Sequence, residues 1–206
     1  YFYNVSYYLM IKRNIFISYH HKSDFKYLIE LRNIVKNRSF SDYGFKDKDL
    51  DESSKSSIAK EIQYRIWASS IIIVLVGGET GRSNWVDWEI WYSLREIKGY
   101  KISRRKFKPK GILAIFLPVK KHNVPIRLQE NLDSGYAKKI YWSDLKNSFD
   151  KSIVEAYDNR KYLSKIRNDY STLKINPQKT GLLFSKISYC ILFNFKKIVD
   201  ALHGYR

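Results

Sequence analysis

One acidic residue, Glu89, lies in a segment of unusual composition. Residues 85–91 read W-V-D-W-E-I-W, with three tryptophans within seven residues. If the segment is helical, Trp85 and Glu89 lie on the same side, because residues four apart share a helix face. A carboxylate beside aromatic rings is costly to desolvate unless it is paired or takes part in a reaction. Glu89 therefore borders the core, where it is either paired or reactive, and the residues alone favour an ion pair at the helix surface.

Two loops could bring further polar groups to Glu89. Residues 18–21 read S-Y-H-H with Asp24 beyond them, and residues 77–83 read G-G-E-T-G-R-S. Backbone N–H groups at a glycine-rich helix start attract phosphate, and Arg82 would add positive charge there. The second loop matches neither the Walker pattern nor the dinucleotide fingerprint G-x-G-x-x-G. As a motif it is weak by itself.

The elements that position these loops alternate between strand and helix. Apolar and β-branched runs predict strands at residues 14–19, 43–45, 71–76, 112–117 and 139–142. Helical spacing predicts helices from Ser23, over 54–68, and from a cap at Ser83 to near Gly99. In the last helix, the residues expected to face the sheet are Val86, Ile90, Leu94 and Ile97. The alternation predicts a doubly wound, mostly parallel α/β sheet with right-handed crossovers.

The predicted domain occupies residues 10–149, because the first strand pattern follows the only methionine, Met10. Residues 1–9 lack the basic start of a secretory signal, and we interpret them as an upstream or disordered segment. Residues 150–206 are expected to form a helical extension of two helices, broken near Pro177. Its apolar run at 187–195 is too short for a transmembrane span. We expect a packing or oligomerisation helix there, with a membrane-surface helix as the alternative.

Composition narrows the setting of the protein. Lys and Arg outnumber Asp and Glu by 38 to 20, a net charge of +18 that attracts anions such as nucleotides, nucleic acid or acidic lipid. AT-rich coding, which favours Lys, Ile, Asn and Tyr, explains the excess equally well. A single cysteine, Cys190, excludes an internal disulfide. Together with the missing signal sequence, this indicates a cytoplasmic protein.

Three ordered motifs carry a resemblance to a known family. They are R-N-I-F-I-S-Y-H-H-x-x-D at 13–24, I-V-L-V-G-G-E-T at 73–80 and S-N-W-V-D-W-E-I at 83–90. In this order they resemble the TIR-like domains of Thoeris anti-phage defence proteins, over about residues 13–142. The resemblance implies a flavodoxin-like fold and an enzyme that consumes NAD to make a cyclic or conjugated ADP-ribose signal for a separate effector. It also implies that Glu89 is catalytic and that residues 18–21 line the nucleotide pocket.

The chemistry implied by the resemblance needs only one carboxylate. Glycosidases generally use two, because an alcohol leaving group must be protonated. Nicotinamide leaves NAD as a neutral base, so one carboxylate that holds the ribose and stabilises its developing positive charge is sufficient. Substrate contacts are expected from Ser18, Tyr19, His20, Asp24, Gly78, Thr80 and Trp85. No cofactor or metal is expected, since NAD would be the substrate.

Several alternatives remain beside this interpretation. The second is a catalytically silent TIR-like module that assembles partners through its helices, and a homo-oligomer is left open. The third is nucleic-acid binding through the basic stretch 98–110, which contains Tyr100 and Phe107 for stacking. A calcium loop at Asp47 is rejected, because its sixth residue is glutamate and its twelfth is isoleucine. A receiver domain is rejected because Gly77 stands where the third strand would need an aspartate.

Overall fold

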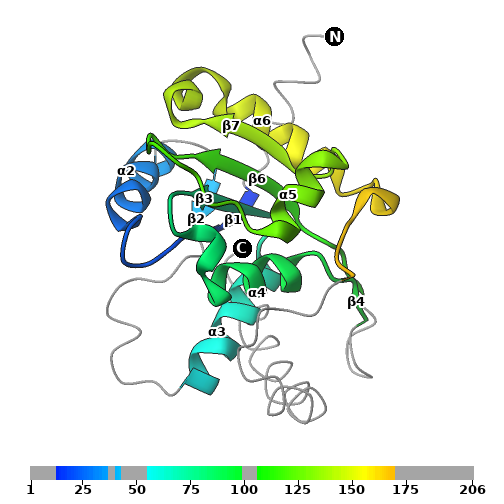
Figure 1. The fold of residues 1–206 in the computed structure, drawn as a ribbon. Helices are drawn as coiled ribbons and strands as arrows, with labels where there is room; N and C mark the ends of the chain where they lie inside the picture. The colour runs from blue at the N-terminus through cyan, green and yellow to red at the C-terminus, as the bar shows by residue number, and fades with distance from the viewer. Residues whose placement is uncertain (1–12, 37–39, 43–54, 99–105, 170–206) are drawn as a thin grey trace, which may run out of the picture. The chain divides into compact units, whose positions relative to one another are not determined.

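A computed structural model describes residues 13–36, 40–42, 55–98 and 106–169 (Figure 1). The chain divides into two compact units. The first contains the described residues up to Arg95 and those from Pro109 onward, and it holds the α/β fold. The second contains a short antiparallel pair, formed by β4 (Ile97–Lys98) and β5 (Lys106–Phe107).

The first unit is built on a five-stranded sheet in which every neighbouring pair is parallel. Its strands in sheet order are β2 (Phe40–Asp42), β1 (Arg13–Ser18), β3 (Ile71–Val76), β6 (Gly111–Phe116) and β7 (Lys138–Tyr141). Every residue of β3 and β6 is buried, as expected for central strands covered on both faces. Register pairs Ser18 with Val74 and Val76 with Phe116, so these strands end at the same edge.

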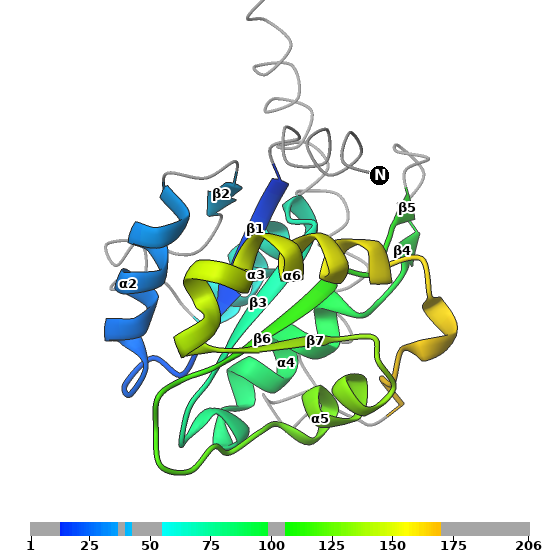
Figure 2. The ribbon, with the colours of Figure 1, turned by 90° about the horizontal axis from the view of Figure 1, so that it is seen from above.

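Five α-helices belong to this unit among the described residues. They are α2 (Phe25–Lys36), α3 (Lys55–Ala68), α4 (Asn84–Ser93), α5 (Ile126–Asp133) and α6 (Leu145–Asn159). The apolar faces of α2 and α6 share one core cluster with alternate residues of the strands, such as Ile15 and Ile17. Helices α3 and α4 cover the opposite face of the sheet (Figures 1 and 2). Side chains of β1 therefore alternate between two helical layers.

The structure confirms the α/β prediction for most elements. The strand expected at 71–76 is β3 with the same bounds, and the strands expected at 14–19, 112–117 and 139–142 are each displaced by one residue. The helices from Ser23 and over 54–68 correspond to α2 and α3. The edge strand expected at 43–45 lies outside the described residues, and β2 immediately precedes that position.

Helix α4 ends earlier than the sequence pattern predicts. It stops at Ser93, whereas the prediction extended it to near Gly99 and placed Ile97 on its apolar face. The backbone N–H of Lys110 donates to the Ser93 carbonyl at 2.8 Å. A carbonyl group of the last helical turn is therefore bonded to the segment that leads into β6. Ile97 belongs instead to β4, which means that the stretch 98–110, predicted as a loop, is partly strand.

The α/β unit also extends further along the chain than expected. Helix α6 runs through the boundary placed at residue 149, and it buries Phe149, Ile153 and Ala156 against the sheet. Helix α5, which follows Pro125, was not foreseen. Within the described ranges no helix combines the length and hydropathy needed to cross a membrane. The predictions for residues 1–9, the break near Pro177 and the apolar run 187–195 lie outside the described residues.

Gly111 tests the packing of β6 against α6. A Cβ at this position would collide with the backbone oxygen of Ala156, closer than real Cβ atoms approach. Gly111→Ala is therefore expected to lower the free energy of unfolding by about 1–3 kcal/mol through overpacking. Chemical denaturation measures the loss. Gly78→Ala is the control, because its Cβ would be in ordinary contact, 3.5 Å from the Lys121 oxygen. Equal losses in the two variants would contradict this packing.

Candidate active site

Glu89 lies at the edge of the sheet where β1 ends. Ser18, the last residue of β1, donates a hydrogen bond from Oγ to Oε2 of Glu89 at 2.5 Å. Helix α4 reaches this position because Ser83 caps its start, accepting the N–H of Val86 at 3.3 Å as predicted. Val86 and Ile90 are buried on the same helix. The carboxyl group is thus held over the carboxyl end of β1, where parallel sheets bind ligands.

Burial changes the acidity of Glu89. The residue is 8% exposed. Loss of hydration raises the pKa of its carboxyl group from 4.5 to about 8, and the hydrogen bond from Ser18 acts in the opposite direction. At neutral pH the group in the free protein is therefore mainly protonated. It becomes a carboxylate as the pH rises through about 8.

The three tryptophans around Glu89 have different partners in the structure. Trp88 is buried and stacks on Tyr92 with ring centres 5.5 Å apart. Tyr92 also stacks on Trp67 of α3, at 5.8 Å, so these rings join α3 to α4. Trp91 carries the guanidinium of Arg95 over its ring. Trp85 is half-buried and edge-on to Trp88, four positions before Glu89 on the same helix.

The first loop places its side chains in two groups. His20 is half-buried and pairs through Nδ1 with the hydroxyl of Ser23 at 2.9 Å. Tyr19 is half-buried as well, and its ring lies 4.6 Å from that of His21. The two neighbouring histidines therefore have different partners. No three His, Cys, Asp or Glu side chains in the described part of the chain are placed to hold a metal ion.

Asp24 and Thr80 join the first loop to the second. Thr80 is fully buried, its Oγ1 accepts the N–H of Gly77 at 2.7 Å, and it lies 3.5 Å from Oδ2 of Asp24. Asp24 is 2% exposed and accepts a hydrogen bond from Ser23. A Cβ on Gly77 would lie 2.6 Å from Oδ1 of Asp24, so glycine leaves room for this carboxylate. Asp24 and Thr80 were expected to contact substrate; in the structure both are buried, and the contact between them joins the two loops.

The second loop does not lead directly into α4. A short 3-10 helix, η2 (Thr80–Arg82), comes between them. Arg82, considered as a phosphate ligand, is exposed and forms an ion pair with Glu79 at 3.0 Å. The charge of Arg82 is therefore already paired within the loop. Gly78, in the same loop, is half-buried.

A third loop, residues 117–125 after β6, was missed by the sequence interpretation. Its Asn123 backbone accepts the N–H of Gly81 at 2.7 Å and donates to the Gly77 oxygen at 2.9 Å. His122 is half-buried, with Nε2 2.7 Å from the Leu117 oxygen and its ring edge-on to Phe116. The signal that could have revealed it is position: it follows a buried strand that ends at the same edge as β1 and β3.

The order of these motifs agrees with one protein family. A family model described as "Thoeris protein ThsB, TIR-like domain" matches residues 16–122, more than half of the 206-residue chain. The chain belongs to this family. The match contains Ser18, the glycine-rich second loop and Glu89, which confirms the resemblance and the TIR-like fold.

Two other comparisons add context to the TIR-like domain. Among solved structures it is similar to one titled "Structure of the activated Roq1 resistosome directly recognizing the pathogen effector XopQ (TIR domains)". The two chains are 17% identical, with a TM-score of 0.36, and the alignment covers 90% of this chain and 99% of the other. The comparison with curated proteins found no match.

The raised pKa of Glu89 makes the stability of the TIR-like domain depend on pH. Between pH 4.5 and about 8 the folded chain keeps a proton that the unfolded chain has lost, so stability falls as the pH rises through this range. The neutral amide of the Glu89→Gln variant has no such proton to lose. Glu89→Gln is therefore expected to melt higher than the native chain at pH 9, by roughly 2–4 °C for each kcal/mol gained. The difference should shrink toward pH 5.

Thermal unfolding at pH 5, 7 and 9 measures this difference. Glu79→Gln is the matched control, because Glu79 is partly exposed and its ion pair with Arg82 lies at the surface. The control should differ from the native chain by a small, nearly constant amount. A Glu89→Gln difference that does not grow with pH would contradict the burial of a protonated carboxyl group.

Proposed function

We propose that the chain is an NAD-consuming TIR-like enzyme of bacterial anti-phage defence, which breaks the bond between nicotinamide and ribose in the cytoplasm. Membership of the ThsB TIR-like family supports the defence setting. The observation that carries the proposal is the hydrogen bond from Ser18 to Glu89, which holds a buried carboxyl group where β1 ends. A ligand at the carboxyl edge of the sheet would meet that group.

The carboxyl group of Glu89 has the geometry to serve a ribose. Ser18 donates its hydrogen bond to Oε2, and among the described residues it is the donor to this carboxyl group. Oε1 is then available for a ribose hydroxyl. As nicotinamide leaves, positive charge develops on the ribose, and an ionised Glu89 in a poorly hydrated site stabilises it strongly. The same charge favours loss of the Glu89 proton, so substrate binding and ionisation support each other.

In this proposal some neighbouring residues contact the substrate, and others hold Glu89 or the loops in place. Tyr19, His20, Gly78 and Trp85 are half-buried at the same edge and contact the dinucleotide. Ser18 orients Glu89, while Asp24 and Thr80 hold the two loops in register. NAD is the substrate, and no further cofactor enters the reaction. Water as acceptor yields ADP-ribose, whereas a hydroxyl of the same molecule yields a cyclic product, so exclusion of water selects the signal. That signal reaches a separate effector, and a phage component triggers its synthesis.

A second candidate function is a catalytically silent module that assembles partners through its helices. The low exposure of Glu89 favours it, because a protonated carboxyl group bonded to Ser18 is also a satisfied core contact. In this case the α4 segment serves packing, and the family fold provides a scaffold. The two functions differ in whether Glu89 affects the fate of NAD.

Nicotinamide release distinguishes the two functions. Purified protein is incubated with NAD, with and without lysate from phage-infected cells, and compared with Glu89→Gln. The enzymatic function predicts release that falls by at least about 100-fold in the variant, the scale seen when a charge-stabilising group is removed. Glu79→Gln, altered in the second loop, should keep activity. Release that is equal in the Glu89 variant, or absent under both conditions, would contradict the enzymatic function and favour the scaffold.

The pH dependence of the reaction provides a separate prediction. Because the pKa of Glu89 in the free protein is raised to about 8, kcat/KM should increase with pH up to about 8 and level off above it. Below the pKa the increase should approach tenfold per pH unit. A rate that is flat between pH 6 and 9 would show that ionisation of this group does not control the reaction.

A further inference from the structure

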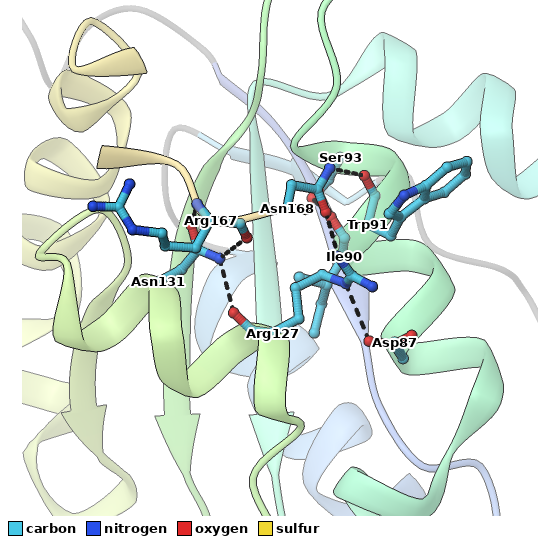
Figure 3. A network of polar contacts seen from close by, with 8 residues as sticks. All are labelled: Asp87, Ile90, Trp91, Ser93, Arg127, Asn131, Arg167 and Asn168. Carbon is cyan, nitrogen blue, oxygen red and sulfur yellow. Dashed lines mark hydrogen bonds and ion pairs between the residues drawn. The ribbon is translucent and has the colours of Figure 1, made fainter. Parts of the chain in front are cut away.

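A chain of polar contacts joins α4 to α5 and to the segment after α6 (Figure 3). Nε of Arg127 in α5 lies 3.2 Å from Oδ1 of Asp87 in α4, and both side chains are buried. Nη1 of the same arginine donates to Oδ1 of Asn168 at 2.6 Å. The Asn168 amide then donates through Nδ2 to the backbone oxygen of Trp91 at 3.1 Å. The contacts therefore leave α4 at one turn and return to it at the next.

A second asparagine fixes the segment that carries Asn168. Asn131 of α5 is fully buried, donates from Nδ2 to the Arg167 oxygen at 2.7 Å and accepts the Arg167 N–H at 3.1 Å. Its amide also donates to the Arg127 oxygen at 2.8 Å. One side chain thus bonds both backbone groups of Arg167. The backbone next to Asn168 is therefore fixed, and this places its side chain against α4.

The contact with Trp91 completes the last turn of α4. Carbonyl groups in the final turn of a helix lack partners within the helix, and they need another donor when water is excluded. The N–H of Arg95 bonds to the Tyr92 oxygen, and Asn168 supplies the donor for Trp91. Asn168 therefore serves two needs at once: it accepts from a buried guanidinium and it caps the helix end.

These contacts lie on the opposite side of α4 from the candidate catalytic group. Asp87 and Glu89 are two positions apart, which places them about 200° apart around the helix axis. Glu89 bonds to Ser18 on one side, while Asp87 bonds to Arg127 on the other. A rotation or slide of α4 would break contacts on both sides, and the buried charges make such a movement costly.

We propose that Asn168 is a positioning residue, which holds α4 through Arg127 and the Trp91 carbonyl so that the Glu89 carboxyl group stays at Ser18. The effect on turnover rests on the proposed function. The effect on the environment of Glu89 does not, and it is measured separately.

The turnover experiment compares variants of the full chain. Asn168→Ala should lower kcat about tenfold and leave KM within about twofold, because the loop contacts from Tyr19, His20 and Gly78 are untouched while the reacting group on α4 shifts. Asn168→Asp should retain part of the rate, since its carboxylate still accepts from Arg127 but cannot donate to Trp91. The matched control is Asn159→Ala, which loses donations to the Gly135 and Tyr136 oxygens at 3.2 and 2.9 Å, away from α4. It should melt lower without losing kcat.

The second experiment needs no activity. Glu89→Gln is introduced into three chains: the native chain, Asn168→Ala and the Asn159→Ala control. In each, the rise in melting temperature that this substitution causes at pH 9 is measured. If Asn168 positions α4, its removal hydrates Glu89, and the rise should shrink by at least half; the control should leave it unchanged. Should Asn168→Ala fail to fold, Asn168→Ser provides the same comparison.

The outcomes separate the two proposals. An unchanged rise in the Asn168 variants would overturn the positioning role whatever the enzyme does. A native chain that releases no nicotinamide would overturn the proposed enzymatic function. The comparison of melting temperatures would still test the role of Asn168. A loss of kcat in Asn159→Ala as large as that in Asn168→Ala, at a similar loss of melting temperature, would also overturn the positioning role.

Discussion

The hydrogen bond between Ser18 and Glu89 is the constraint on which the site depends. It requires Ser18 to face the layer of α3 and α4, whereas its neighbour Ile17 faces the core under α2 and α6. The pairing of Ser18 with Val74 fixes this orientation, since a slip of one residue would turn every side chain of β1 to the other face. The register of buried strands, chosen by apolar burial, thus decides where a single polar hydroxyl points.

The three loops at this edge are joined by hydrogen bonds between buried polar groups. Asp24 and Thr80 connect the first loop to the second, and the Asn123 backbone connects the second to the third. Buried polar groups that all have partners make a loop assembly rigid, because each broken contact leaves an unpaired group without water. The half-buried side chains of these loops, among them Tyr19 and His20, are consequently carried by a rigid backbone.

Burial shifts the acidity of ionisable groups at both edges of the sheet, and in opposite directions for acid and base. It raises the pKa of Glu89 to about 8 at the carboxyl edge. At the amino edge, burial lowers the pKa of Lys110 to about 7, helped by the nearby charge of Arg160. Lys110 donates to the Trp67 oxygen there. Loss of hydration disfavours whichever form is charged, so one cause explains both shifts.

The sequence by itself determined much of this protein. The run of apolar residues 71–76 sufficed for the central strand, Ser83 for the start of α4, and the three ordered motifs for the family. These features are local, since periodicity and caps depend on residues within a few positions of each other. The sequence also singled out Ser18 and Glu89, although it could not show that they touch across 71 positions.

Tertiary structure alone decided which polar groups became partners. Thr80 meets Asp24 from 56 positions away, and Asn168 reaches Trp91 across 77. The end of α4 likewise depends on Lys110, which no local pattern connects to Ser93. A periodic pattern tells which face of an element avoids water, but the neighbour that satisfies a donor or acceptor appears only when distant segments pack together.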